Sequence, residues 1–162
     1  MKNIVESIVN NNPEPVFEIS TDILVPFYDV DSMDIVWHGH YVKYFEDARC
    51  CLLNQLDYNY QTMRASGFAW PVVDLRVKYV KPAQFNRLIR VFARLIEWEV
   101  RLKIDYRIID VESGATLTKG HSVQVALDMH NNNEMCFATP EVLRKKIQQK
   151  FIDLQQRERS ES

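Results

Sequence analysis

The sequence predicts an α+β domain in which a strongly curved antiparallel sheet wraps around one long central helix, with a further helix at the C-terminus. One early segment repeats apolar residues at helical spacing, and four later segments in a row alternate apolar with charged residues. A second stripe at helical spacing closes the chain. Because the strands follow one another directly after the long helix, the helical cover falls on one face of the sheet.

Length and composition restrict the class of protein further. The chain has 162 residues, 46% hydrophobic and 26% charged, which suits one soluble globular domain. Its formal net charge of -2 predicts neither a nucleic-acid nor a membrane partner, but leaves room for a local basic patch that binds a phosphorylated ligand. No segment approaches the roughly 18 apolar residues of a membrane span or contains a signal-peptide core. The cysteines show no framework spacing, so we expect a reducing, cytoplasmic environment.

Breaker-rich residues divide the chain into three parts. The run Asn-Asn-Asn-Pro-Glu-Pro ends a predicted mobile arm of residues 1–15. The main domain is expected over 16–138, and a C-terminal helix with its tail over 139–162. The main domain opens with a strand between Val16 and Pro26, because the apolar residues there fall on odd positions.

The long helix is predicted from about His38 to Asn54. Its apolar residues recur at helical spacing: Tyr41, Tyr44, Phe45, Ala48 and Leu52. A short second helix or a structured loop, closed by Gly67, follows over 56–67. Alternation then predicts strands over 73–79, 89–95, 102–108 and 117–127, with Glu112-Ser113-Gly114 as a hairpin turn.

The C-terminal segment begins with a helix-start signal. Thr139 is predicted to cap the helix and Pro140 to occupy its first position. We expect its apolar stripe to pack on a subunit or a neighbouring element: Leu143, Ile147, Phe151 and Leu154. The tail from Arg157 is expected to be disordered.

An acidic turn that contains Asp31 leads directly into the long helix. The first amides of a helix lack partners and carry partial positive charge. They can hold a polarised carbonyl oxygen beside Asp31, and a carboxylate near a helix N-terminus is held ionised and positioned for attack. The sequence therefore predicts a hydrolytic site at this junction.

The same junction carries a family resemblance. From Phe27 to Arg49 the chain reads Phe-Tyr-Asp-Val-Asp-Ser-Met-Asp-Ile-Val-Trp-His-Gly-His-Tyr-Val-Lys-Tyr-Phe-Glu-Asp-Ala-Arg, with Asp31 seven residues before His38. A Tyr-x-x-Pro-Ala element begins at Tyr79. Together these motifs resemble the signature of the 4-hydroxybenzoyl-CoA thioesterase family (YbgC type), whose fold is the hotdog.

The resemblance implies hydrolysis of acyl thioesters of coenzyme A or an acyl carrier protein, without metal or other cofactor. Asp31 matches the catalytic aspartate, which acts as nucleophile or as general base for water. His38 accompanies it in the catalytic pair, and amides near His38 would hold the thioester oxygen. Phe27 and Trp37 stand where the family often has tyrosine, and the Phe27 change removes a hydroxyl that would assist Asp31. Asp34 stands where glycine is common, and we expect it to cap the helix or to narrow the choice of acyl chain.

Substrate-binding residues are predicted from side-chain chemistry. Large rings leave narrow slots that favour flat or extended chains, so we expect acyl contacts from Trp37, Tyr41 and Trp70. Guanidinium groups suit the phosphates of coenzyme A, although arginines spread over two strands equally fit a solvated face. The candidates for phosphate binding are Arg87, Arg90 and Arg101.

The sheet is expected to associate with further copies of the chain. Phe92, Ile96 and Trp98 place apolar side chains on the face opposite Val91 and Leu95. Edge strands also offer unpaired backbone groups. We therefore expect a homodimer that pairs sheets edge to edge, doubled to a homotetramer, with the active site between two chains.

Other interpretations stay open. Asp31 and its acidic neighbours are also ordinary turn and cap residues, and Glu46 with Arg49 fits an intrahelical ion pair. A hotdog dehydratase of hydroxyacyl chains would need a histidine on a Pro-Gly-rich loop, where this chain has only Gly39-His40. A non-catalytic acyl-binding or assembly module would show no hydrolysis of any thioester.

Overall fold

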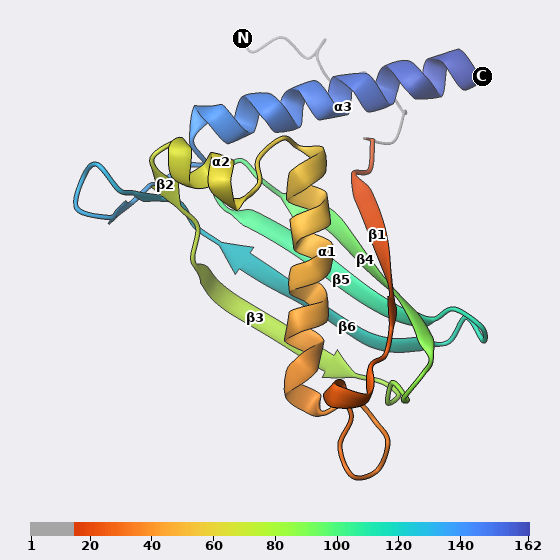
Figure 1. Cartoon of the computed structure of the whole chain (residues 1–162). Coiled ribbons are helices and arrows are strands. Elements are labelled where there is room, and N and C mark those ends of the chain that lie inside the picture. Colours follow the sequence, from red (N-terminus) through yellow and green to blue (C-terminus); the bar gives the residue numbers. More distant parts are fainter. Residues whose placement is uncertain (1–14) are drawn as a thin grey trace, which may run out of the picture.

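A curved antiparallel sheet forms the body of the protein in the computed structural model, which describes residues 15–162. Its five strands have the order β1-β4-β5-β6-β3, with bounds β1 Glu18–Leu24, β3 Val72–Tyr79, β4 Leu88–Glu97, β5 Leu102–Asp110 and β6 Thr116–Gln124. The helix α1, Tyr41–Gln55, lies across one face of this sheet (Figure 1). The predicted fold class is confirmed, whereas the predicted N-terminal arm lies outside the described residues except for Pro15.

The face of α1 that meets the sheet carries the predicted apolar stripe, and all its members are buried: Tyr41, Tyr44, Phe45, Ala48 and Leu52. The ring of Phe45 stacks on Tyr106 of β5, with centroids 4.5 Å apart and planes at 8°. Gly120 of β6 makes room for this stack, because a Cβ there would lie 2.7 Å from the Phe45 ring. Burial of one such ring contributes about 1.5–3 kcal/mol, so tertiary packing is the main force that holds α1.

The long helix begins at Tyr41 rather than at His38, because His38–His40 form a separate 3-10 turn, η3. The amide of His40 donates to the carbonyl of Trp37 at 2.9 Å, which is the tighter 3-10 pattern. No side chain caps η3 or α1, so the expected capping role of Asp34 is wrong. Asp34 instead adopts a φ of 58°, in the left-handed region that glycine prefers.

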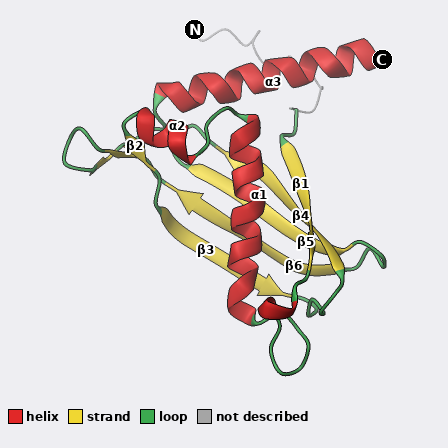
Figure 2. Cartoon of the chain, in the orientation of Figure 1, coloured by secondary structure: helices red, strands yellow, loops and turns green. Residues whose placement is uncertain are grey.

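Short elements lie beside the C-terminal end of α1 (Figure 2). The short helix expected after α1 is α2, Tyr60–Ala65, and Asn59 caps it by accepting a bond from the amide of Thr62. Gly67 closes it with a φ of 88°. A three-stranded sheet follows in the order β2-β7-β8, with bounds β2 Phe68–Ala69, β7 Leu127–Asp128 and β8 Glu134–Met135. The single strand expected over 117–127 is thus divided, because the chain leaves the main sheet after β6 and pairs elsewhere.

The C-terminal helix α3, Glu141–Glu161, crosses the end of α1 (Figure 1). Leu143 and Ile147 are fully buried in the core of the same chain, and Phe151 lies against Trp98 with centroids 6.2 Å apart. None of the helices within residues 15–162 is both long and apolar enough to cross a membrane.

Two expectations about α3 are wrong. The helix starts one position later than expected, with Pro140 as the N-cap residue and no side-chain cap, and the buried hydroxyl of Thr139 has no partner among the described residues. The tail expected to be disordered is helical to Glu161. Its Gln, Arg and Glu residues are good helix formers, which lets α3 continue past its last apolar contact.

Candidate active site

The turn that carries Asp31 is a closed loop braced against the segment after β3. The amide of Asp31 donates to the carbonyl of Ile35 at 2.8 Å, and that of Asp34 donates to the carbonyl of Asp31 at 3.1 Å. An isolated bridge joins Ile35 to Gln84. The backbone position of Asp31 is therefore fixed from both sides of the loop.

The side chain of Asp31 lies at a cavity of about 310 Å³ at the start of α1. One carboxylate oxygen, Oδ1, accepts a bond from the amide of Met33 at 2.8 Å. The cavity is lined by Asp31, Ile35, Val36, His38, Tyr41, Tyr79, Val80, Lys81 and Pro82. The structure thus brings the predicted residues Asp31, His38 and Tyr41 together, along with the start of the Tyr-x-x-Pro-Ala element.

Two tyrosines attach the end of β3 to the start of α1. The hydroxyl of Tyr79 donates to the carbonyl of His38 at 2.5 Å, and the hydroxyl of Tyr41 accepts a bond from the amide of Ala83 at 3.0 Å. Their rings meet edge to face, with centroids 5.2 Å apart. Burial raises the pKa of the Tyr41 hydroxyl above its usual value. Tyr41 therefore stays protonated, and its own proton is available to a group in the cavity.

The backbone amides at the helix start differ in whether they have a partner. The amide of Trp37 donates to the carbonyl of Asp29 at 3.0 Å, and the amide of His40 is bonded to Trp37. Since the first amides of a helix have no partner within it, those of His38 and Gly39 are the donors that η3 offers to a ligand.

A buried carboxylate that the sequence did not single out anchors this turn to α1. Asp29 is 2% exposed and accepts hydrogen bonds from the ammonium of Lys43 and, at 2.7 Å, from the hydroxyl of Tyr44. The Nε2 atom of His40 lies 4.0 Å from it. Burial works to raise the pKa of the Asp29 carboxyl, but the bonds from Lys43 and Tyr44 outweigh burial and hold the pKa below its usual value. Spacing along the chain gave no signal for this cluster, because its partners lie on a separate element.

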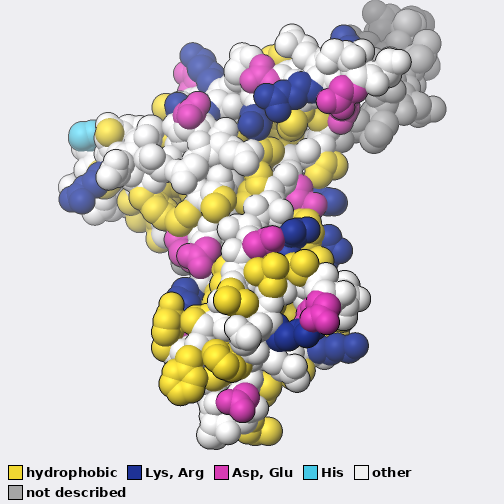
Figure 3. All heavy atoms as spheres, turned by 45° about the vertical axis from the view of Figure 1, so that its right-hand side comes forward, with side chains coloured by type: hydrophobic (Ala, Val, Ile, Leu, Met, Phe, Trp, Pro, Cys, Tyr) yellow, Lys and Arg dark blue, Asp and Glu magenta, His cyan; other side chains and the backbone are white. Residues whose placement is uncertain are grey.

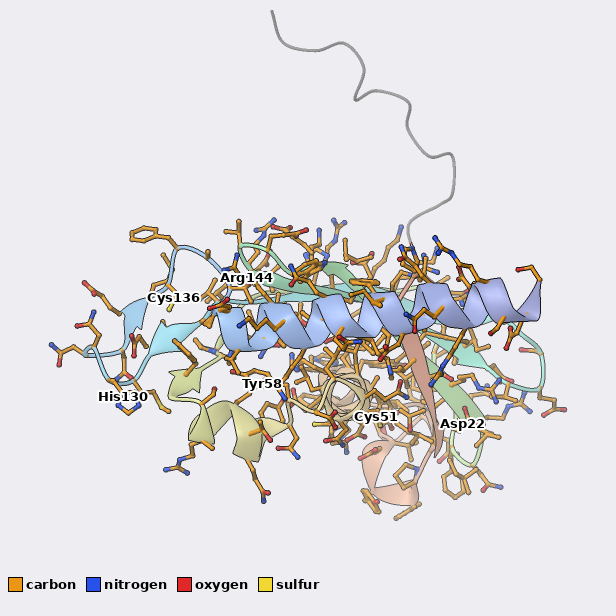
Figure 4. All side chains as sticks on the ribbon, turned by 90° about the horizontal axis from the view of Figure 1, so that it is seen from above. Asp22, Cys51, Tyr58, His130, Cys136 and Arg144 are labelled. Carbon is orange, nitrogen blue, oxygen red and sulfur yellow. The ribbon has the colours of Figure 1, made fainter. Side chains whose placement is uncertain are left out.

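The two predicted tryptophans lie at opposite ends of α1. Trp37 is 47% exposed and packs over Gly39, where a Cβ would lie 2.0 Å from its ring. Trp70 is 7% exposed, and its indole N–H donates to the hydroxyl of Tyr58 at 3.3 Å. Figure 4 shows Tyr58 on the α2 side of the molecule, beneath α3. Neither indole is among the residues that line the Asp31 cavity, so their contact with the acyl group stays a prediction.

Each arginine suggested for phosphate binding already pairs with a carboxylate. Arg87 forms a two-pronged pair with Asp110, with both bonds at 2.9 Å. Arg90 pairs with Asp22 of β1, which is labelled in Figure 4. Arg101 pairs with Glu97. These pairs favour the solvated-face interpretation for the three arginines.

The expected intrahelical pair between Glu46 and Arg49 is confirmed. Arg49 is only 7% exposed and also reaches the hydroxyl of Ser122 on β6 at 3.4 Å. Tyr60 of α2 donates to Glu46. The pair therefore connects α1 with β6 and α2, away from the Asp31 cavity.

An antiparallel sheet around one helix, with an acidic turn at the helix start, defines the hotdog class of thioesterase-like proteins. The family model of the thioesterase-like superfamily matches residues 25–159, and the chain belongs to this superfamily. The predicted family resemblance is confirmed.

Individual relatives agree with this assignment. YneP of Bacillus subtilis is 34% identical over 65 residues, which are 40% of this chain and 47% of YneP. The chain thus spans about half the length of that relative. Acyl-CoA thioester hydrolase YbgC of Escherichia coli O6:H1 is 25% identical over 92 residues, 56% of this chain and 69% of YbgC. The solved structure of DHNA-CoA thioesterase from Staphylococcus aureus superposes with a TM-score of 0.68 at 25% identity, covering 74% of this chain and 80% of that one.

Proposed function

We propose that the protein hydrolyses acyl thioesters of coenzyme A and that Asp31 is the reacting carboxylate. The observation that carries this proposal is the cavity in which Asp31 lies beside the helix-start residue His38. The names of YbgC and the Staphylococcus aureus enzyme, which specify CoA thioesters, support the substrate class. A thioester on an acyl carrier protein contains the same reacting bond, and the assay below distinguishes the two carriers.

In the proposed reaction the thioester carbonyl oxygen accepts hydrogen bonds from the amides of His38 and Gly39. These bonds strengthen as the oxygen gains negative charge in the transition state. Asp31 either attacks the carbonyl carbon and forms an anhydride that water then hydrolyses, or removes a proton from a water molecule that attacks. Both routes break the carbon–sulfur bond and release the thiol and a carboxylic acid.

We further propose that the working form is a dimer joined along β3. This strand is an edge of the main sheet, and several of its apolar side chains are exposed, Val73 by 57%, Leu75 by 40% and Tyr79 by 50%. Rings of the acidic turn are also exposed, Phe27 by 75% and Tyr28 by 80%. Figure 3 shows hydrophobic side chains gathered at the end of the molecule that carries this turn. A partner strand would satisfy the edge and cover these side chains.

The dimer places the Asp31 cavity close to a second chain, because Tyr79 belongs both to β3 and to the cavity wall. Light scattering at micromolar concentration tests this proposal. A mass of two or four chains is expected, and a mass of one chain would contradict it.

The function is tested with a panel of aromatic and straight-chain CoA thioesters, by release of the free thiol, and with one acyl chain on a carrier protein. We expect Asp31→Asn to lower turnover by about 100-fold or more, because the amide keeps the shape of the side chain but loses its charge. Asp34→Asn is the matched control. Asn tolerates the left-handed backbone of that position, so the fold and most of the activity are expected to remain.

Circular dichroism and thermal unfolding serve as the check that both variants are folded. If Asp31→Asn keeps most of its turnover while Asp34→Asn loses it, the reacting carboxylate is Asp34. If the unmodified protein hydrolyses none of the thioesters yet binds them, the chain is an acyl-binding module.

A further inference from the structure

The face of the main sheet that is turned away from α1 carries a depression of about 540 Å³. Five of its basic side chains come from three adjacent strands, Arg76 and Lys78 from β3, Lys119 and His121 from β6 and Arg107 from β5. The ring of Phe92 on β4 lies at its other end, and the remaining lining residues are Glu18, Arg94, Asp105, Tyr106 and Gly120. We name this depression the cation groove.

Strand register brings like charges directly opposite one another in the cation groove. Lys78 pairs with Lys119, and Lys119 pairs with Arg107 on its other side. Arg76 faces His121 in the neighbouring rung. Side chains directly opposite in an antiparallel pair are about 4.5–5.5 Å apart at Cβ, and like charges there destabilise the sheet.

The arginines on β4 and directly before it are neutralised by carboxylates. Arg90 pairs with Asp22, Arg94 with Glu18, and Arg87 with Asp110 and Glu112. Within residues 15–162, no carboxylate forms an ion pair with the basic side chains on the β3, β5 and β6 part of the groove, namely Arg76, Lys78, Arg107 and Lys119.

The acidic residues of the cation groove do not remove this excess of positive charge. Glu18 is taken by Arg94, and His121 lies 3.7 Å from Asp74. Asp105 stands in the rung of His121 and Arg94, one rung away from the row of Lys78, Lys119 and Arg107. That row is therefore available to an anion with several charges.

A planar platform borders the row of cations. The guanidinium of Arg107 lies over the ring of Phe92, 4.5 Å from its centroid. Both groups stack well on flat aromatic rings. The volume of the groove is within the range of small-molecule sites, about 300–1,000 Å³. A ligand that combines phosphates with a flat ring matches both features.

We propose that the cation groove binds a nucleoside polyphosphate, with its phosphates on Lys78, Lys119 and Arg76 and its base on the platform of Arg107 and Phe92. The site goes beyond the proposed hydrolysis, because it lies on the opposite face of β3 from the Asp31 cavity. Tyr79 faces that cavity, and the preceding residue Lys78 faces the groove. Two sources share this chemistry, a free nucleotide such as ATP and the 3′-phosphorylated nucleotide of coenzyme A.

Isothermal titration calorimetry of the full chain tests the proposal with four probes: ATP, coenzyme A, AMP and inorganic triphosphate. We expect ATP or coenzyme A to bind at micromolar to submillimolar concentration, AMP to bind at least about 10-fold more weakly than the tighter of them, and affinity to fall as salt is raised. If ATP binds at least as tightly as coenzyme A, the source is a free nucleotide. Preference for coenzyme A identifies the coenzyme as the source.

The variants are Lys119→Gln and, as matched control, Arg101→Gln, which removes a cation of the turn between β4 and β5 that pairs with Glu97 outside the groove. Lys119→Gln should weaken the tighter nucleotide by at least about 10-fold, and Arg101→Gln by less than about 2-fold. Without nucleotide, Lys119→Gln should melt at the same or a higher temperature, because it relieves repulsion from Lys78 and Arg107.

Several results would overturn the proposal. The first is the absence of binding heat from both ATP and coenzyme A at about 1 mM, which is a weak limit for a specific site. The second is equal binding of the nucleotide by the two variants, and the third is binding of triphosphate as tight as that of the nucleotides. Titrations are repeated on Asp31→Asn. Since they measure binding rather than hydrolysis, the groove and the proposed reaction succeed or fail separately.

Discussion

Replacement of Asp29 by asparagine tests whether one buried carboxylate holds the acidic turn against α1. Asparagine has the same shape and still accepts a bond from the hydroxyl of Tyr44, but it carries no charge to meet the ammonium of Lys43. The Asp29 side chain is 2% exposed and that of Lys43 46%, so the pair is buried on one side only.

The size of the effect follows from these contacts. A hydrogen bond to a charged group contributes about 1.5–3 kcal/mol, and the open side of Lys43 reduces its share through solvent screening. We expect Asp29→Asn to lower the free energy of unfolding by about 2 kcal/mol. A domain of this size loses about 2–4 °C of melting temperature per kcal/mol, so the expected decrease is about 4–8 °C.

The pH dependence provides a sharper measurement. The pKa of the folded-state Asp29 carboxyl is held below its usual value, so its contribution is fully present above the unfolded-state pKa of about 3.9. It is lost as the pH falls through the lower folded-state pKa. Thermal unfolding of both proteins between neutral and acidic pH should show a difference that is constant near neutrality and narrows below about pH 4.

Asp22→Asn is the control, because Asp22 is an exposed carboxylate on β1 that pairs with Arg90 on β4. Its effect on melting temperature should be much smaller, since exposed ion pairs contribute little. Equal shifts for Asp29→Asn and Asp22→Asn, or a difference that does not change with pH, would refute the anchoring role of Asp29.

Three further predictions concern the site and its supports. Trp37→Ala should widen the range of acyl chain lengths without loss of stability, because the ring is half-exposed, and an unchanged chain-length profile would count against its place at the acyl group. Trp70 is buried, so Trp70→Ala should lower the free energy of unfolding by about 3–5 kcal/mol. Gly120→Ala should destabilise the fold by about 1–3 kcal/mol in denaturant titration, since its Cβ would lie 2.2 Å from the backbone oxygen of Arg76 and 2.7 Å from Phe45. If the variant is as stable as the unmodified protein, the stack of Phe45 on Tyr106 shifts easily and does not require glycine. Tyr79→Phe frees the carbonyl of His38 and should lower kcat by about 10-fold while leaving KM similar, as expected for lost positioning; a change in KM alone would assign Tyr79 to substrate binding.

The helix and the main sheet were predictable because their signals are local. Period-two alternation and the stripe from Tyr41 to Leu52 each express burial against one layer, so they can be read without knowledge of the partner. The meeting of Asp31 with His38 also follows from short spacing along one turn. The two-residue strands β2, β7 and β8 lack enough residues to show a period, and they were missed for that reason.

Contacts between distant elements could not be predicted in the same way. The partners of Asp29 depend on how the turn folds over α1, and the carboxylates that neutralise Arg87 and Arg90 depend on strand register. A one-residue change of register would give each arginine a different neighbour. The sequence therefore indicated which residues are charged and left their pairing undetermined.

Two neighbouring residues of strand β3, Lys78 and Tyr79, line different sites on opposite faces of the sheet. Alternation turns Tyr79 toward the Asp31 cavity and Lys78 toward the opposite face. A slip of one residue against β6 would therefore replace the aromatic ring in the cavity wall with an ammonium group. A bulge between Val72 and Asp74 marks the place where the strand absorbs irregular length before this alternation begins. In homologous sequences, insertions and deletions should therefore occur before the position of Asp74. The segment from Asp74 to Tyr79 should keep a constant length even where its residues change.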